Sequence, residues 1–189
     1  SNLTLWKNES KYEDINAHFF DADNDNDLDL YVVSGGYELK ENDPLLQDRL
    51  YLNNGNGTFK KSSKLPKMLT SGKSIATADI DNDGDLDIFV GGNVVPGKYP
   101  ETPFSYLLEN DKGTFKDITS TAGKELKQYG IINDAIFTDI DNDKDPDLVI
   151  AGEWIPITVF KNNNGVFTKS PNEAIETKTG WWNSLLAHD

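Results

Sequence analysis

Three acidic segments of nine residues carry the clearest potential for chemistry in this sequence. They are residues 21–29, 79–87 and 139–147, and they begin 58 and 60 residues apart. In each segment an aspartate occupies positions 1, 3, 5, 7 and 9. Five neighbouring carboxylates repel one another unless a cation neutralises them, and hard cations such as Ca²⁺ prefer oxygen ligands. The pattern therefore predicts about three Ca²⁺ ions, one for each complete segment.

The spacing of the aspartates also predicts how each segment would hold its ion. In a compact loop, side chains at positions 1, 3 and 5 converge from one side, position 7 commonly offers its backbone carbonyl, and a further carboxylate closes the shell. Position 9 is the closing carboxylate here. The candidate metal ligands are Asp21, Asp23, Asp25, Asp27 and Asp29 in the first segment, Asp79, Asp81, Asp83, Asp85 and Asp87 in the second, and Asp139, Asp141, Asp143, Asp145 and Asp147 in the third.

The residues after each segment argue against an EF-hand. An EF-hand has a glutamate at position 12 and a helix after its loop. Here position 12 is Val32, Val90 or Ile150, and the residues around it have the β-branched and aromatic character of a strand. The alternative that the segments are Asp-rich and Asn-rich turns without a metal stays open.

The three sites are not expected to bind equally. Position 6 favours a residue that tolerates the left-handed backbone conformation, and it is Asn26, Gly84 and Lys144 in the three segments. Lysine there costs on the order of 1 kcal/mol and places a positive charge near the cation. Pro146 further restricts Asp145 to extended conformations. We expect the third site to be the weakest.

The charge distribution narrows the classes of partner. The formal net charge is −14, and the three segments, with 15 aspartates and one lysine, account for all of it. Nucleic acids and anionic membranes require a concentrated basic patch, so neither is an expected partner. No apolar run of 18 residues is present, so we expect no membrane insertion. Acidic loops of this kind suit the calcium levels outside cells, which favours an extracellular, cell-surface or periplasmic location.

Other features repeat in step with the acidic segments. A short apolar strand pattern precedes each segment, another follows it, and each repeat then contains a Gly-bearing hairpin ending in an aromatic residue, at 50–59, 106–115 and 158–167. The strand after each segment is apolar on both faces, so both faces must be buried. Stacked four-stranded sheets satisfy this requirement. We expect an all-β fold: a β-propeller segment of about three four-stranded blades, each with one calcium loop.

The repeats define the expected organisation of the chain. Residues 1–189 form a single propeller fragment, with repeats at approximately 15–72, 73–132 and 133–180 and the start of a further repeat at 181–189. Closed propellers have about four to eight blades, so we expect either further blades of a parent protein or self-association. The variable stretches 34–49 and 93–104 are the expected places for ligand contacts.

These motifs resemble a known family. The Asp-x-Asp-x-Asp-x-x-x-Asp segments and the Gly-Asn-Gly-Thr-Phe hairpin at 55–59 resemble FG-GAP or VCBS repeats, the calcium-binding blades of integrin-like β-propellers and of many secreted bacterial proteins. Residues 151–156 and 180–184 further resemble the bacterial subset associated with ASPIC/UnbV modules. The resemblance implies an exported bacterial protein with a role in adhesion, in protein or ligand interaction, or as a scaffold.

No pattern of residues singles out a catalytic site. The two histidines, His18 and His188, lie just before an acidic segment or its equivalent, and no nucleophile elbow or phosphate-binding loop is present. The candidate ligand-binding residues are Trp154, Trp181 and Trp182, because exposed indoles stack on sugar rings. A simpler interpretation is that they fill the spaces between blades. An unidentified protein or glycan is the expected partner, and a carbohydrate-binding or polysaccharide-degrading propeller is the alternative function.

Overall fold

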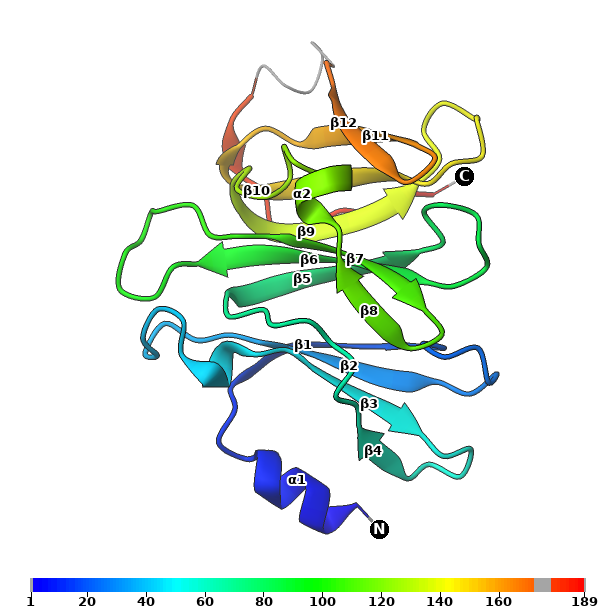
Figure 1. The fold of residues 1–189 in the computed structure, drawn as a ribbon. Coiled ribbons are helices and arrows are strands. Elements are labelled where there is room, and N and C mark those ends of the chain that lie inside the picture. The colour runs from blue at the N-terminus through cyan, green and yellow to red at the C-terminus, as the bar shows by residue number, and fades with distance from the viewer. Residues whose placement is uncertain (1, 172–177, 189) are drawn as a thin grey trace.

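The computed structural model describes residues 2–171 and 178–188, which form three antiparallel sheets stacked one on another (Figure 1). The first sheet contains β1 (Asp14–Phe20), β2 (Asp29–Ser34), β3 (Arg49–Asn53) and β4 (Phe59–Lys61). The second contains β5 (Ser71–Ala78), β6 (Asp87–Val94), β7 (Tyr106–Asp111) and β8 (Thr114–Asp117). The third contains β9 (Ile131–Thr138), β10 (Asp147–Ile155), β11 (Thr158–Asn163), β12 (Val166–Ser170) and β13 (Gly180–Trp181). The predicted all-β fold of four-stranded repeats is confirmed for this part of the chain.

Each sheet is a meander in which consecutive strands are hydrogen-bonded neighbours. The three acidic loops occupy the same place in every sheet, because each joins the first strand to the second. The third sheet has an addition that the others lack: β13 pairs antiparallel with the end of β10. It spans the predicted boundary between the third repeat, 133–180, and the further repeat that begins at 181.

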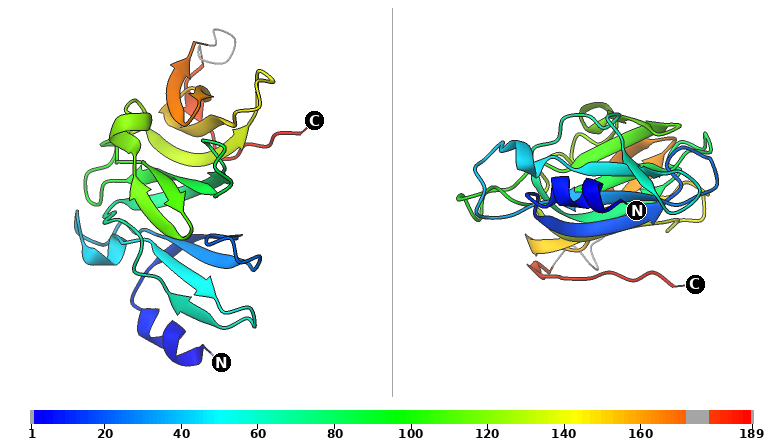
Figure 2. Two further views of the ribbon diagram at one scale, coloured as in Figure 1. Left: turned by 45° about the vertical axis from the view of Figure 1, so that its right-hand side comes forward. Right: turned by 90° about the horizontal axis from the view of Figure 1, so that it is seen from below.

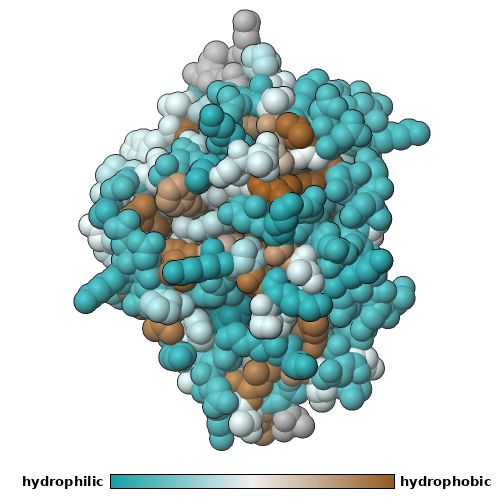
Figure 3. All heavy atoms as spheres, viewed as in Figure 1, coloured by the Kyte–Doolittle hydropathy of each residue, from teal (hydrophilic) through white to brown (hydrophobic). Residues whose placement is uncertain are grey.

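Helical structure is limited to short elements among the described residues. They are α1 (Leu3–Glu9), the 3-10 turn η1 (Pro44–Leu46) and α2 (Thr119–Ala122). None of the helices in this part of the chain is long and apolar enough to cross a membrane. On the face shown in Figure 3, hydrophilic residues predominate and hydrophobic residues form separate patches.

Two apolar cores hold the three sheets together. The core between the first and second sheets includes Tyr31 and Val90, and the core between the second and third includes Phe89 and Ile150. Neighbouring residues of β6 therefore face opposite cores, which confirms that this strand is buried on both faces. Full burial of a side chain of this size stabilises the fold by about 1.5–3 kcal/mol. Packing of this kind sets the sheets in the stacked order that Figures 1 and 2 show.

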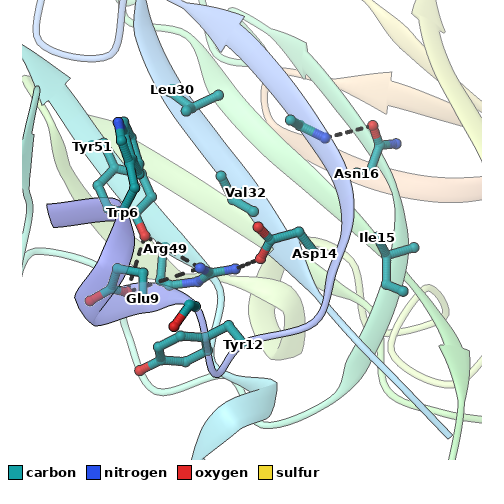
Figure 4. A pocket seen from close by; sticks show the side chains of 12 residues that line it. Trp6, Glu9, Tyr12, Asp14, Ile15, Asn16, Leu30, Val32, Arg49 and Tyr51 are labelled. Atoms are coloured by element: carbon teal, nitrogen blue, oxygen red, sulfur yellow. Dashed lines mark hydrogen bonds and ion pairs between the residues drawn. The ribbon is translucent and has the colours of Figure 1, made fainter. Parts of the chain in front are cut away.

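Helix α1 packs against the outer face of the first sheet. The ring centroid of Trp6 lies 5.1 Å from that of Tyr51 and 6.1 Å from that of Phe59. The Glu9 carboxylate accepts hydrogen bonds from Tyr51 Oη at 3.1 Å and from Lys61 Nζ at 2.7 Å. Figure 4 shows Trp6 beside Tyr51, with Glu9 close to Arg49. This helix was not predicted, because seven residues with few apolar positions give no clear helical pattern.

Candidate metal centres

The three acidic loops share one backbone arrangement, which the aspartate at position 1 organises. In the first loop Asp21 accepts hydrogen bonds from the backbone N–H groups of Asp25, at 3.2 Å, and Asn26, at 2.9 Å. Asp79 and Asp139 accept bonds from the equivalent residues of the other two loops at 3.0–3.2 Å. The position 1 carboxylate thus bonds to the backbone of positions 5 and 6 and holds the loop in the same turn in all three sheets.

Position 6 has a left-handed backbone in every loop. The φ angles are 69° at Asn26, 94° at Gly84 and 79° at Lys144. The sequence prediction about this position is confirmed. Only glycine and, less readily, asparagine adopt this conformation without appreciable strain, so the third loop contains the least suitable residue.

The aspartate at position 9 fastens each loop to its sheet. Asp29, Asp87 and Asp147 are all buried. Asp87 accepts bonds from the backbone N–H groups of Ile80, at 3.0 Å, and Asn110, at 2.7 Å. Asp29 and Asp147 make the equivalent pairs of bonds, at 2.7–3.1 Å. The closing carboxylate therefore connects its loop to the third strand of the sheet, which predicts that its loss loosens both.

Burial perturbs the acidity of these closing groups. It raises the pKa of Asp29 and Asp147, and it raises that of Asp87 to about 7, although the backbone hydrogen bonds lower the pKa of all three. The protein thus holds carboxylates where the charged form is disfavoured. A cation placed beside them reverses this preference, because it stabilises the ionised carboxylate.

Carboxylate oxygens converge within each loop. The groups are Asp21, Asp23 and Asp29 in the first loop, Asp79, Asp81 and Asp87 in the second, and Asp139, Asp141 and Asp143 in the third; one oxygen from each member lies within 4.8 Å of the others in its group. The first two groups follow positions 1, 3 and 9, whereas the third follows positions 1, 3 and 5, and its three residues are exposed. Asp25 and Asp83, predicted as ligands at position 5, lie outside these groups.

Unpaired oxygens show that the first loop fits a bound cation. Asp23 Oδ1 and Asp27 Oδ1 are inaccessible to solvent and have no hydrogen-bond partner among the described residues. Burial raises the pKa of Asp23, and the charges of Asp25, Asp21 and Asp27 raise it further. Leaving buried carboxylate oxygens unpaired is costly. A hard divalent cation would supply the missing interaction, and the donor set of carboxylate oxygens matches Ca²⁺.

The carboxylates at position 7 of the second and third loops bind the preceding repeat and lie outside the converging groups. Asn24 of the first loop donates to Asp85 of the second, and Asn82 of the second loop donates to Asp145 of the third at 3.1 Å. These side chains join successive loops. These side-chain contacts do not involve the backbone carbonyl at position 7, so its role as a metal ligand stays a prediction.

Hairpin asparagines also connect each repeat to the loop before it. Asn110 is buried and donates from Nδ2 to the carbonyl oxygens of Ala22, at 2.9 Å, and Leu86, at 3.1 Å. Asn162 donates in the same way to Ile80, at 2.7 Å. Sequence reasoning assigned these asparagines only to turns. The two asparagines occupy the same place in the second and third hairpins, and this repetition could have indicated a shared structural role.

A lysine distinguishes the third loop. Lys161 Nζ lies 2.7 Å from Asp141 Oδ2, and this hydrogen bond lowers the pKa of Asp141. The ammonium group of Lys161 therefore competes with a metal ion for the Asp141 carboxylate. Together with Lys144, this contact supports the expectation that the third site is the weakest.

Comparison with known proteins found a similarity to a described family in the part of the chain that contains the first two loops. Residues 21–90 match the sequence profile of the FG-GAP-like repeat. The match supports the FG-GAP repeat family. It begins at the first acidic loop and ends in β6, so it includes two acidic loops of the FG-GAP-like type and the first hairpin. A search of curated proteins found no match to this chain.

The structure brings two of the three candidate tryptophans together, outside the FG-GAP-like loops. Trp154 is 63 % exposed and Trp181 is 57 % exposed, and their ring centroids are 5.7 Å apart. These two residues therefore fill no space between the three described sheets, and their packing against a further blade stays a prediction. Trp182 is half-buried, and its backbone N–H donates to the carbonyl oxygen of Gly152 at 3.0 Å.

Two other polar features have structural explanations. His18 Nε2 lies 3.1 Å from Thr77 Oγ1, and burial lowers its pKa, as expected for a packed strand residue. Asp48, which the sequence did not single out, is buried and accepts bonds from Tyr31 Oη at 2.9 Å and from the backbone N–H of Ser34 at 2.8 Å. Burial raises the pKa of Asp48 to about 7.

Another cavity lies away from the acidic loops. It measures about 630 Å³ and lies between α1 and the first sheet, where Trp6, Tyr12 and Ile15 form part of its wall (Figure 4). Arg49 in this wall is buried and pairs with Asp14. Its guanidinium carbon lies 4.2 Å from the ring centroid of Tyr12. These contacts satisfy the buried charge, which is consistent with a role in fixing α1.

Proposed function

We propose that this chain is a calcium-binding β-propeller module, in which the ions stabilise the repeats and the assembled surface acts in protein or ligand interaction or as a scaffold. The observation that carries the proposal is that a carboxylate cluster occurs in the same loop of three successive sheets, with two unpaired buried oxygens in the first. A turn without a metal does not require such convergence.

The aspartates at positions 1, 3 and 9 would hold the ion in the first two loops, and those at positions 1, 3 and 5 in the third. Bound Ca²⁺ supplies charge neutralisation between carboxylates. Because the closing aspartate also bonds to the third strand of its sheet, the same residues couple ion binding to the packing of the sheet. Ion binding then adds directly to folding stability, by about 2.7 kcal/mol per site when free Ca²⁺ is 100 times the dissociation constant.

Contacts between the first strands of successive repeats support the propeller arrangement. Asn16 donates to the carbonyl oxygen of Lys73 at 3.0 Å, and Lys73 Nζ donates to Asn133 Oδ1 at 2.7 Å. Asn133 Nδ2 then donates to the carbonyl oxygen of Trp182 at 3.0 Å. These contacts form a line through all three sheets into the next segment, as expected for strands around a common axis. Further blades or a second copy of the chain are the proposed partners that complete the arrangement.

We also place the module outside the cytosol of a bacterium, at the cell surface, in the periplasm or in the medium. Exposed acidic loops such as the third are suited to the higher calcium concentrations found outside cells. Adhesion is one interaction role consistent with this location.

Thermal unfolding tests the calcium claim. The chain is freed of metal and then melted alone, in excess Mg²⁺ and across a Ca²⁺ titration. We expect Ca²⁺ to raise the midpoint strongly and Mg²⁺ to raise it little, because Mg²⁺ requires a smaller octahedral shell and loses its water reluctantly. Identical melts with and without Ca²⁺ would show that the loops are not calcium sites.

A carbohydrate-binding propeller is the second candidate function, favoured by the exposed pair of Trp154 and Trp181. Such a pair provides flat apolar surfaces of the kind that sugar rings contact. A panel of oligosaccharides, assayed in the presence and absence of Ca²⁺, distinguishes this candidate from a purely structural scaffold. Binding of a neutral oligosaccharide that Trp154→Asn abolishes would support it.

A further inference from the structure

A second cavity lies where all three sheets approach one another. It measures about 310 Å³. Its wall includes Glu13, Tyr37, Glu38, Asn93, Tyr99 and Glu153. Four of these residues come from the variable stretches 34–49 and 93–104, which differ in length between the repeats. The cavity is therefore built from the least repetitive parts of the chain, where ligand contacts are expected to diversify.

The charged side chains in the wall of this cavity are all negative. Three carboxylates line it, and the described residues in its wall include no lysine and no arginine. Glu153 is buried, and among the described residues its carboxylate has one hydrogen-bond partner, Tyr99 Oη at 3.0 Å, and no ion pair. A buried carboxylate without a cationic partner is unfavourable unless a ligand supplies the positive charge. This arrangement favours a cation over a neutral or anionic ligand.

Tyr99 lines the cavity, and Trp154 and Trp181 lie next to its wall through their contacts with Tyr99 and with the strand of Glu153. Trp154 Nε1 donates to Tyr99 Oη at 3.1 Å, and Tyr99 in turn donates to Glu153. Trp181 is the strand partner of Glu153, and its ring lies beside that of Trp154. Exposed indole and phenol faces attract organic cations through their π electrons. The aromatic rim and the carboxylate wall therefore favour the same class of ligand.

The backbone at Trp154 is strained in a way that fixes this rim. Trp154 has a φ of 62°, which a bulky residue rarely adopts. It is the extra residue of an irregularity in the pairing of β10 with β13, because Glu153 pairs with Trp181 and Ile155 pairs with Gly180. Such bulges redirect side chains at functional sites. The positive φ holds the Trp154 side chain beside Trp181 and within hydrogen-bond distance of Tyr99, and backbone strain of this kind is concentrated at functional sites.

We propose that this cavity and its rim of Tyr99, Trp154 and Trp181 bind a small organic ligand that carries an ammonium group. The ammonium group lies against the indole faces and is neutralised by the Glu153 carboxylate. This deepens the interaction role proposed above and does not use the metal ligands. The assay is performed in saturating Ca²⁺ with a melt for every protein, so a failed calcium claim appears in the melt and a failed ligand claim in the binding curve.

The test compares choline with 3,3-dimethylbutan-1-ol, its neutral carbon analogue, by calorimetry and by tryptophan fluorescence. We expect choline to bind about tenfold more tightly than the analogue, because only choline gains the cation–π and carboxylate interactions. Glu153→Gln keeps an acceptor for Tyr99 and removes the charge, so it should weaken choline binding about tenfold. Trp154→Asn should weaken it similarly, and asparagine tolerates the left-handed backbone.

Glu109→Gln is the matched control, because it removes a carboxylate on β7 that lies outside this cavity. It should leave choline binding unchanged. Equal binding of choline and its analogue would overturn the proposal, as would tight binding of neutral N-acetylglucosamine with none of choline. Absence of choline binding by the folded, calcium-loaded chain would also overturn it. If either Glu153→Gln or Trp154→Asn melts differently from the parent, the comparison of choline binding uses the other variant.

Discussion

In the metal-free protein, the contribution of Asp87 to stability should fall as the pH rises from about 4 to 7, and its size can be calculated. Burial raises the pKa of Asp87 from 3.8 to about 7 in the folded state without metal. Between these values the folded state keeps a proton that the unfolded state has released, so unfolding becomes more favourable with increasing pH. Below pH 3.8 the group contributes nothing, and above 7 its ionisation costs at most about 4 kcal/mol.

The variant Asp87→Asn isolates this contribution because it does not titrate. Other groups act in both directions: the pKa of Asp48 is also raised, whereas those of Glu9 and Asp141 are lowered. The quantity to measure is therefore the difference in unfolding free energy between parent and variant, by urea denaturation at several pH values.

Without metal, the parent should lose up to about 4 kcal/mol relative to Asp87→Asn as the pH rises from 4 to 7.5. In saturating Ca²⁺ the sign should reverse, because the ion stabilises the charged carboxylate of the parent. A flat difference in metal-free buffer, or a parent that gains relative stability with pH, would refute the reasoning about Asp87.

Three further predictions concern the loops and the core. Lys144→Gly combined with Lys161→Gln should tighten the third Ca²⁺ site. The first change relieves the backbone strain at position 6, and the second frees the Asp141 carboxylate. Calorimetry that shows an unchanged affinity of the weakest site would contradict this. Asn110→Ala should destabilise the protein by about 1–3 kcal/mol, since two carbonyl oxygens lose a buried donor, and urea denaturation measures it. Phe89→Ala should cost about 3–5 kcal/mol through the cavity left in the core, and a cost below 1 kcal/mol would mean that this core is loosely packed.

Much of the fold was predictable because its signals are local and repeat. Apolar residues on both faces of the strand after each loop indicated sandwiched sheets, and β2, β6 and β10 occupy those stretches. The hairpin turns contain glycines in left-handed conformations, such as Gly57 and Gly113, as the turn chemistry requires. Helix α1 was missed because its stability depends on Trp6 packing against a sheet that is distant in sequence.

The candidate sites were predictable to different degrees. The aspartates of each loop were found because their spacing is encoded within nine residues, and the loops do gather carboxylates. Reasoning from spacing did not reveal that Asp85 and Asp145 bind the preceding repeat, because that contact requires two loops to be stacked. The cavity at Glu153 was missed for the same reason, since its wall combines residues from three sheets.

The number of Ca²⁺ ions bound per chain is the decisive measurement for the three loops. Metal-free protein is titrated with Ca²⁺ by calorimetry, and the bound metal is then counted by elemental analysis after dialysis. The account predicts three ions per chain, one for each carboxylate cluster, with the weakest site lost when Asp139 is replaced by alanine. A chain that binds no Ca²⁺ and melts identically in its presence would contradict the account.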